Sequence, residues 1–229
     1  MSAVLADVLA RTDIWRGDRC AGASLPVVPS GFSDLDAELP GGGWPRGALI
    51  ELLSDGSGLG EVSLLLPALR AVREEGGWSL LVAPPHPPHA PAWAAAGADL
   101  SRLAVVSPAS ERDSLWAMEQ ALVSGAPGLV LGWADYADVR ALRRLQVAAA
   151  AGRVLTLLFR PLRAIREASP APLRLALAAG VEGRLSVRIL KRRGPPPTAL
   201  LDLTLPRPAR PHSHGSPLAG HTSTAAACV

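Results

Sequence analysis

Between residues 48 and 159, short runs of aliphatic residues alternate with segments of helical periodicity, and this alternation constrains the fold more than any other feature. The pattern predicts strands at 48–53, 78–83, 103–106, 129–131 and 153–159, with helices between them at 61–73, 90–97, 114–123 and 137–151. Strands that alternate with helices form right-handed βαβ units with parallel strands. The sequence therefore predicts an α/β domain with a mostly parallel sheet.

The pattern changes after residue 170, where three strand-like runs follow one another across short turns rich in Gly or Pro. These runs, at 173–178, 184–190 and 199–205, predict an antiparallel extension of the sheet at its C-terminal side. Before the domain, apolar residues at helical spacing in 3–10 predict a short helix, followed by an irregular linker at 21–30. Ser33 is the predicted cap of a one-turn helix at 34–38.

We therefore expect three parts: an N-terminal helix and linker (1–24), the α/β domain (25–205) and a disordered tail (206–229). The tail carries His212, His214 and His221, which lack the spacing of a metal site and favour a solvated segment. Cys20 and Cys228 lie near opposite ends of the chain without the spacing of a disulfide framework or a zinc site. The start has no signal-peptide pattern, so the expected location is the cytoplasm.

Charge is distributed unevenly along the chain, although the net charge is only +3. Residues 1–139 hold 8 basic and 17 acidic residues, whereas residues 140–193 hold 13 basic and 2 acidic residues. Such a basic segment favours a nucleic acid or an acidic protein surface as partner, or it forms a solvated face. Because no nucleic-acid motif accompanies the charge, a protein partner is the preferred interpretation.

The stretch from residue 29 to 52, PSGFSDLDAELPGGGWPRGALIEL, resembles the segment that leads into the phosphate loop of RecA-like ATPases. The resemblance continues through 92–103 and 186–198 and spans about residues 25–205. Within that superfamily, Trp15-Arg16-Gly17, the PGGGWPRGALIELL run, LLFRP and KRRGPPP resemble the ImuA family, which are accessory proteins of the bacterial translesion-synthesis mutasome. The resemblance implies a RecA-like P-loop NTPase core.

In this resemblance, the phosphate loop falls at 55–63, DGSGLGEVS. A working loop, GxxxxGK[ST], uses backbone N–H groups and a Lys to hold phosphates and a hydroxyl to hold Mg²⁺. This chain places Asp55 at the first Gly, Glu61 at the Lys and Val62 at the hydroxyl position. Since carboxylates repel a triphosphate, we expect a degenerate loop without a nucleotide cofactor. Its residues are Asp55, Gly56, Ser57, Gly58, Leu59, Gly60, Glu61, Val62 and Ser63.

The other catalytic positions implied by the resemblance are altered as well. The glutamate that activates water falls at Pro85, and the aspartate that ends the strand 129–131 falls at Gly132 and Trp133, with Asp135 too late in register. We therefore expect no catalytic residue, no metal site and no ATP hydrolysis, and a residual ATPase is the less favoured alternative.

Two other catalytic alternatives are weaker still. His86 and His89, as a catalytic base, lie in a Pro-rich loop without a nucleophile at fixed spacing. Three serines without a GxSxG context favour turn and cap roles, namely Ser107, Ser110 and Ser114.

The resemblance also places candidates for surface contacts. Lys191 and Arg193 match two basic residues that in RecA filaments reach toward the nucleotide of the adjacent subunit, so they are interface candidates; the alternative is a basic strand end. The segments that match RecA's DNA-binding loops, 134–138 and 161–172, are short, which disfavours filament-style DNA pairing. Weak phosphate contacts are predicted for Arg140, Arg143, Arg144, Arg160, Arg163, Arg166 and Arg174.

By its resemblance to ImuA, the chain is expected to be a non-catalytic adaptor in SOS-induced translesion synthesis. The implied partners are an ImuB-like Y-family polymerase homologue, a C-family error-prone polymerase and the RecA filament, near the nucleoid when DNA is damaged. The alternative is a cell-division inhibitor resembling SulA, which is also a RecA-like domain without a working phosphate loop and would act on FtsZ. SulA is shorter, and an FtsZ target gives no reason for the basic segment.

Overall fold

The computed structural model describes residues 26–56, 58–194 and 200–206. The predicted N-terminal helix, the Trp15-Arg16-Gly17 motif, both cysteines and the three tail histidines lie outside these residues, as does nearly all of the predicted tail.

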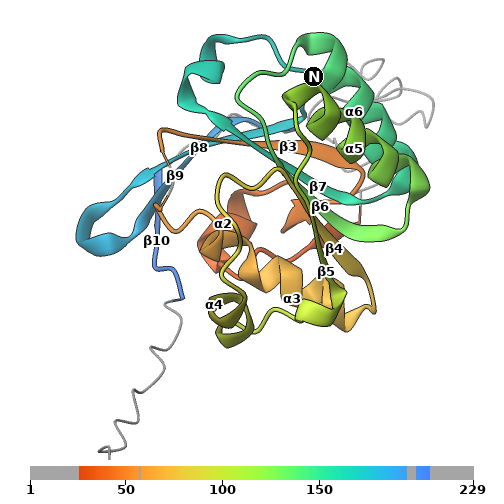
Figure 1. Ribbon diagram of the computed structural model, residues 1–229. Helices are drawn as coiled ribbons and strands as arrows, with labels where there is room; N and C mark the ends of the chain where they lie inside the picture. The colour runs from red at the N-terminus through yellow and green to blue at the C-terminus, as the bar shows by residue number, and fades with distance from the viewer. Residues whose placement is uncertain (1–25, 57, 195–199, 207–229) are drawn as a thin grey trace, which may run out of the picture.

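The described residues form a mixed α/β domain around an eight-stranded sheet (Figure 1). The strand order is β10-β9-β8-β3-β7-β6-β4-β5. The six strands from β8 to β5 run parallel, and β9 and β10 are added antiparallel at one side. The predictions of a mostly parallel sheet and of an antiparallel C-terminal extension are therefore confirmed. The strands are β3 (Ala48–Ser54), β4 (Trp78–Val82), β5 (Leu103–Val106), β6 (Pro127–Trp133), β7 (Leu155–Pro161), β8 (Leu173–Ala179), β9 (Leu185–Lys191) and β10 (Leu200–Leu203).

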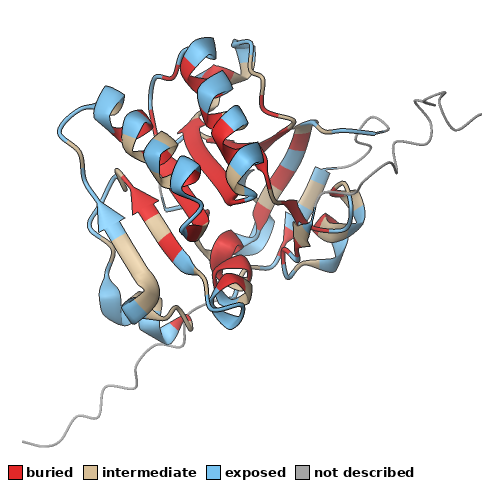
Figure 2. Ribbon diagram, turned by 90° about the vertical axis from the view of Figure 1, so that its right-hand side faces the viewer, coloured by how far each residue is buried: buried red, intermediate tan, exposed pale blue. Residues whose placement is uncertain are grey.

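Helices cover both faces of the sheet. The helices α3 (Leu66–Glu74) and α4 (Ala90–Ala95) lie on one side, and α5 (Glu111–Ser124) and α6 (Val139–Gly152) lie on the other (Figure 1). Because successive strand residues point to opposite faces, Ile50 packs into the core under α3 while Leu49 packs into the core under α5 and α6. Burial on both faces explains the nearly continuous aliphatic strands (Figure 2). Within the described ranges, no helix has the length and apolar character needed to cross a membrane.

The helix starts differ from the prediction for local reasons. α5 begins three residues early because the Ser110 hydroxyl accepts the Asp113 N–H at 3.2 Å, and the Asp138 carboxylate caps α6 in the same way. α3 begins late because residues 63–65 first form a 3₁₀ turn and Pro67 occupies its first turn.

Two expectations near the start of the domain were wrong. Ser33 does not cap the helix α2 (Ser33–Glu38): it is the first helical residue, and the cap position is held by Phe32. Part of the expected linker is the strand β1 (Val27–Val28), which pairs antiparallel with β2 (Trp44–Pro45). A two-residue strand gives no periodicity signal, and its partner lies in a stretch that reads as a turn.

The described connections include four short 3₁₀ helices: η2 (Ser63–Leu65), η3 (Leu100–Arg102), η4 (Leu162–Arg166) and η5 (Val181–Gly183). Of these, η2 and η4 follow the ends of the central strands, where the candidate site lies.

A buried ion cluster ties the three central strands together. Glu51 lies in the middle of β3 with no exposed surface. Its Oε1 accepts from Arg160 Nη1 on β7 at 2.9 Å, and its Oε2 accepts from Arg174 Nε on β8 at 2.5 Å. Each guanidinium also donates through its Nη2. Arg160 Nη2 donates to Glu167 Oε2 at 2.6 Å, and Arg174 Nη2 donates to the Ala164 carbonyl at 2.7 Å. A buried charge is costly alone, so each member depends on the others.

Replacing Glu51 with Gln leaves the buried Arg174 without its anion and leaves Arg160 with Glu167 alone. We therefore expect Glu51→Gln to lower the free energy of unfolding by about 3–5 kcal/mol. Urea denaturation followed by circular dichroism measures this change. Glu74→Gln is the matched control, because the Glu74 side chain is 70% exposed and its pair with Arg73 is 3.8 Å long; its cost should stay below about 1 kcal/mol. Equal costs for the two variants would contradict a stabilising role for the cluster.

Candidate functional site

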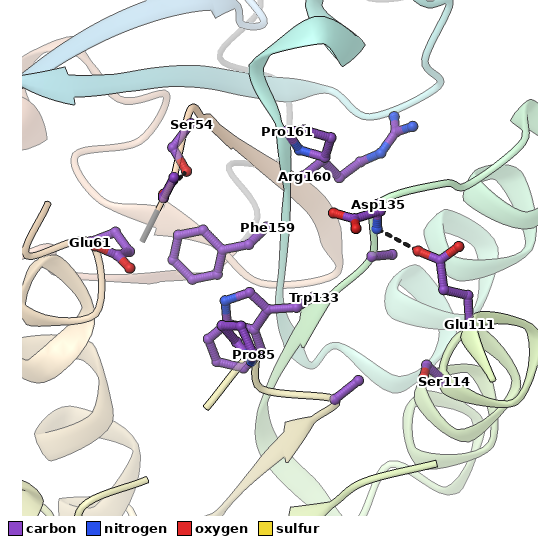
Figure 3. A pocket seen from close by; sticks show the side chains of 13 residues that line it. Ser54, Glu61, Pro85, Glu111, Ser114, Trp133, Asp135, Phe159, Arg160 and Pro161 are labelled. Carbon is purple, nitrogen blue, oxygen red and sulfur yellow. Dashed lines mark hydrogen bonds between the residues drawn. The ribbon is translucent and has the colours of Figure 1, made fainter. Parts of the chain in front are cut away.

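A pocket of about 390 Å³ opens where β3, β4, β6 and β7 end (Figure 3). In open α/β sheets, ligands bind outside the carboxyl ends of the strands, at the point where consecutive connections lead to opposite sides. Here the connection from β3 leads to β4, which lies on the β7 side of β3. The connection from β7 leads to β8, which lies on the opposite side of β3. The lining residues are Ser54, Gly56, Glu61, Ala83, Pro85, Glu111, Ser114, Trp133, Ala134, Asp135, Phe159, Arg160 and Pro161.

The predicted degenerate loop borders this pocket, and the Glu61 side chain of the loop lies at the pocket wall. Gly56, Gly58 and Gly60 all have positive φ values, of 96°, 89° and 84°, which only glycine adopts easily. The Gly58 N–H donates to Glu61 Oε1 at 3.1 Å. The Glu61 side chain points toward Phe159 in Figure 3, and the residue is only 8% exposed. The loop thus gives one of its backbone donors to an internal carboxylate.

These residues do not fit a nucleoside triphosphate. A phosphate at this place would compete with Glu61 for the loop N–H and lie beside its negative charge. Arg160 is the one cation among the lining residues, and it already binds Glu51 and Glu167.

A stacked aromatic pair forms the floor of the pocket. The rings of Trp133, at the end of β6, and Phe159, on β7, have centroids 5.3 Å apart and an interplanar angle of 17°. β6 and β7 are neighbours in register, with Trp133 opposite Phe159. Sequence reasoning missed this pair, because the two residues are paired by the strand order and not by any local motif.

The two positions where the resemblance expects catalytic carboxylates hold other groups. Gly132 packs against α5 so closely that a Cβ there would lie 2.2 Å from Met118 Sδ. Pro85 lines the pocket beyond Ala83, a non-glycine residue with a φ of 53°, a strained conformation of the kind that clusters at functional sites. Asp135, expected to be out of register, nevertheless reaches the pocket edge.

The segment that carries Asp135 is held by α5. Glu111, in the first turn of α5, accepts the backbone N–H groups of Asp135 at 2.5 Å and Tyr136 at 2.9 Å (Figure 3). Glu111 was not among the candidate residues, because the predicted helix began at residue 114 and left Glu111 in the preceding loop.

Three of the histidine and serine alternatives have structural roles, namely His89, Ser110 and Ser114. His89 Nδ1 accepts the Ala92 N–H at 3.3 Å as the cap of α4, and His86 is exposed in the same loop. Ser110 caps α5, and Ser114 Oγ donates to the Ser110 carbonyl at 3.0 Å. None of these contacts joins a nucleophile to a base.

The interface candidates lie away from the pocket. Lys191 is exposed at the end of β9, opposite Arg174 near the start of β8, and its Nζ donates to the Ser169 carbonyl at 2.9 Å. Arg193 is exposed two residues later. Since the pocket is at the carboxyl ends of the parallel strands, these two side chains do not reach the pocket of their own chain.

The candidate nucleic-acid contacts divide into exposed and buried residues. Arg140 and Arg143 are exposed on α6 and make no ion pair with any residue in the described ranges, whereas Arg144 pairs with Glu119 at 3.0 Å. Arg163 lies 4.9 Å from the centroid of the Tyr136 ring, and Arg166 is exposed in the same turn.

Burial corrects the expectation for Arg160. It is 3% exposed and its guanidinium is held by Glu51 and Glu167, so a phosphate backbone cannot reach it. Arg174 is buried in the same cluster. Both belong to the structural core of the domain and not to a basic surface.

Comparison with known proteins places this domain in a family. Residues 51–156 match the family model described as cell division inhibitor SulA. The cell division inhibitor SulA of Edwardsiella piscicida is 34% identical over 118 residues, which are 51% of this chain and 70% of that relative. The RecA protein of Francisella tularensis subsp. novicida is 30% identical over 115 residues, and this stretch is 50% of this chain but only 32% of RecA.

The similarity to RecA is therefore partial, whereas the similarity to SulA covers more than two thirds of that protein. The matched residues include the degenerate loop, Trp133 of the pocket floor, most of β3 and all of β4, β5 and β6, whereas Phe159 on β7 lies just beyond the match. On this basis, the chain belongs to the SulA family.

Proposed function

We propose that this protein is a non-catalytic accessory protein of the bacterial DNA-damage response that acts by binding other proteins. One observation carries the proposal: the Glu61 carboxylate takes a backbone donor of the loop that a nucleotide phosphate would need. A carboxylate in this position disfavours a triphosphate by like-charge repulsion. Pro85 and Gly132, at the other expected catalytic positions, supply neither a base nor a metal ligand.

The first candidate process is translesion DNA synthesis. The SulA match ends at residue 156, within β7, so β8, β9 and β10 lie beyond it. This additional part includes Lys191 and Arg193, which belong to the KRRGPPP segment that resembles ImuA. We propose an ImuB-like polymerase homologue, a C-family polymerase and the RecA filament as partners, with the exposed Lys191 and Arg193 on the RecA-binding surface.

The second candidate process is inhibition of cell division. It is favoured by the SulA family model and by the relative in Edwardsiella piscicida, both of which are described as cell division inhibitors. This candidate uses the same non-catalytic domain but a different target.

The purified protein should bind no labelled ATP in a filter assay and release no phosphate above background, because Glu61 competes with the nucleotide for the loop. Phosphate release measured with and without single-stranded DNA tests this expectation. A hydrolysis rate that falls in Asp55→Asn or Glu61→Gln would overturn the proposal.

Charge reversal at Lys191→Glu with Arg193→Glu should weaken capture of RecA filaments about tenfold or more, since a favourable charge pair becomes a repulsive one. Capture by immobilised protein at several salt concentrations measures the effect. Arg184→Glu with Arg188→Glu is the matched control, because Arg184 is exposed just before β9, Arg188 is exposed on β9, and the change in charge is equal. Equal losses in the two double variants would assign the effect to net charge and remove Lys191 and Arg193 from the interface.

Cell-based assays separate the two candidate processes. Deletion of the gene should reduce the frequency of damage-induced mutations to nearly the level of undamaged cells, and overproduction should leave cell length unchanged. Filamentous growth on overproduction, with unchanged mutation frequency in the deletion strain, would favour the division inhibitor instead.

A further inference from the structure

The pocket combines negative charge with an aromatic surface. Glu61, Glu111 and Asp135 supply three carboxylates to its lining, from three separate segments of the chain. The single lining cation, Arg160, is matched by Glu51 and Glu167. Because neighbouring strand residues point to opposite faces, Phe159 faces the pocket and the α3 side, whereas the Arg160 side chain points away from Glu61 (Figure 3) and binds Glu51. The pocket therefore favours a cation over an anion.

One carboxylate oxygen in this pocket lacks a partner. Glu61 Oε1 binds the Gly58 N–H, but Glu61 Oε2 is buried and makes no hydrogen bond to any described residue. A buried carboxylate oxygen without a donor is costly, and native structures usually satisfy such an atom. A turn of the Glu61 side chain into the pocket that it lines would present this oxygen to a donor from outside the domain, and a positively charged donor would neutralise the carboxylate as well.

The aromatic floor suits the same kind of ligand. Trp133 is partly exposed and its back is supported by Phe159. A guanidinium or ammonium group over the face of an indole gains cation–π attraction, and guanidinium also stacks as a planar group. The volume of about 390 Å³ lies in the range of pockets that enclose small ligands.

We propose that this pocket binds a cationic side chain, the guanidinium of an arginine or the ammonium of a lysine, presented by a partner protein. The cation donates to Glu61 Oε2, stacks on Trp133 and is balanced by Glu111 and Asp135 at the mouth. The rim residues Pro85 and Pro161 offer apolar surface to the chain that carries the cation, which a free amine would leave uncovered. The proposal rests on the proposed function in one respect: the pocket serves a partner and not a nucleotide.

Titration followed by the indole N–H resonance of Trp133 tests the proposal, with the resonance assigned by its loss in Trp133→Phe. The probes are the peptide Ac-Gly-Arg-Gly-NH₂, the same peptide with neutral citrulline, agmatine as a free guanidine, and ADP as an anion. We expect the arginine peptide to shift the resonance and saturate. The citrulline peptide and ADP should not shift it, and agmatine should bind more weakly than the arginine peptide.

Glu61→Gln should lower the affinity for the arginine peptide about fivefold to tenfold, because one short charge pair is lost while the shape of the side chain is kept. Asp135→Asn, at the exposed mouth, should weaken it less, and this variant keeps the test informative if Glu61→Gln does not fold. Glu74→Gln, on α3 and outside the pocket, should leave the affinity unchanged.

Several results would overturn the proposal: no shift with the arginine peptide, equal affinity for the citrulline peptide, or unchanged affinity in both Glu61→Gln and Asp135→Asn. Binding of agmatine without binding of the peptide would overturn the assignment to a partner protein. The phosphate-release assay tests the proposed function, and the Trp133 titration tests the cation site. Failure of the proposed function and failure of the cation site are therefore distinguishable.

Discussion

The buried pairing of Glu51 with Arg160 and Arg174 is the constraint on which the rest of the domain depends. It joins β7, β3 and β8, the three strands at the centre of the sheet. The same guanidinium groups also bind the carbonyls of Ala137 and Ala164, which fixes the segments after β6 and β7. Since β6 and β7 supply Trp133 and Phe159, the ion cluster sets the geometry of the pocket floor from the opposite face of the sheet.

Most of the fold was predictable because its signals are local. The run ALIELL is short and follows a Gly-rich turn, which predicts a buried strand, and Leu115, Met118 and Leu122 mark one face of a helix by their spacing. The ion cluster was not predictable, because Glu51 and Arg160 are 109 residues apart and meet only through the order of the strands. Arg160 in the sequence is one arginine of a basic segment. Its burial made it a core residue and changed its expected role from phosphate contact to structural partner.

In the candidate site, too, features with a local sequence signal were predictable and features set by the order of the strands were not. Glu61 in place of a lysine was visible in the motif, and the structure adds that the carboxylate bonds to the Gly58 N–H of its own loop. The stack of Trp133 on Phe159 and the position of Glu111 depend on which strands and helices are neighbours. Sequence reasoning therefore identified the segments of the site but not its aromatic and acidic character. The similarity to the SulA family model covers only part of the chain, residues 51–156. The strands β8, β9 and β10, with Lys191, lie beyond the matched residues.

The packing of Gly132 bears on which side chains the end of β6 can carry. An aspartate at this position would bring its Cβ to 2.2 Å from Met118 Sδ, so the Met118 side chain would have to move to another rotamer. An acidic side chain at the end of β6 therefore depends on how the Met118 side chain of α5 packs. The Met118 side chain thus couples the packing of α5 to the chemistry of the pocket: while its sulfur fills the space beside Gly132, the carboxylates of the pocket come from Glu61, Glu111 and Asp135 and not from the end of β6.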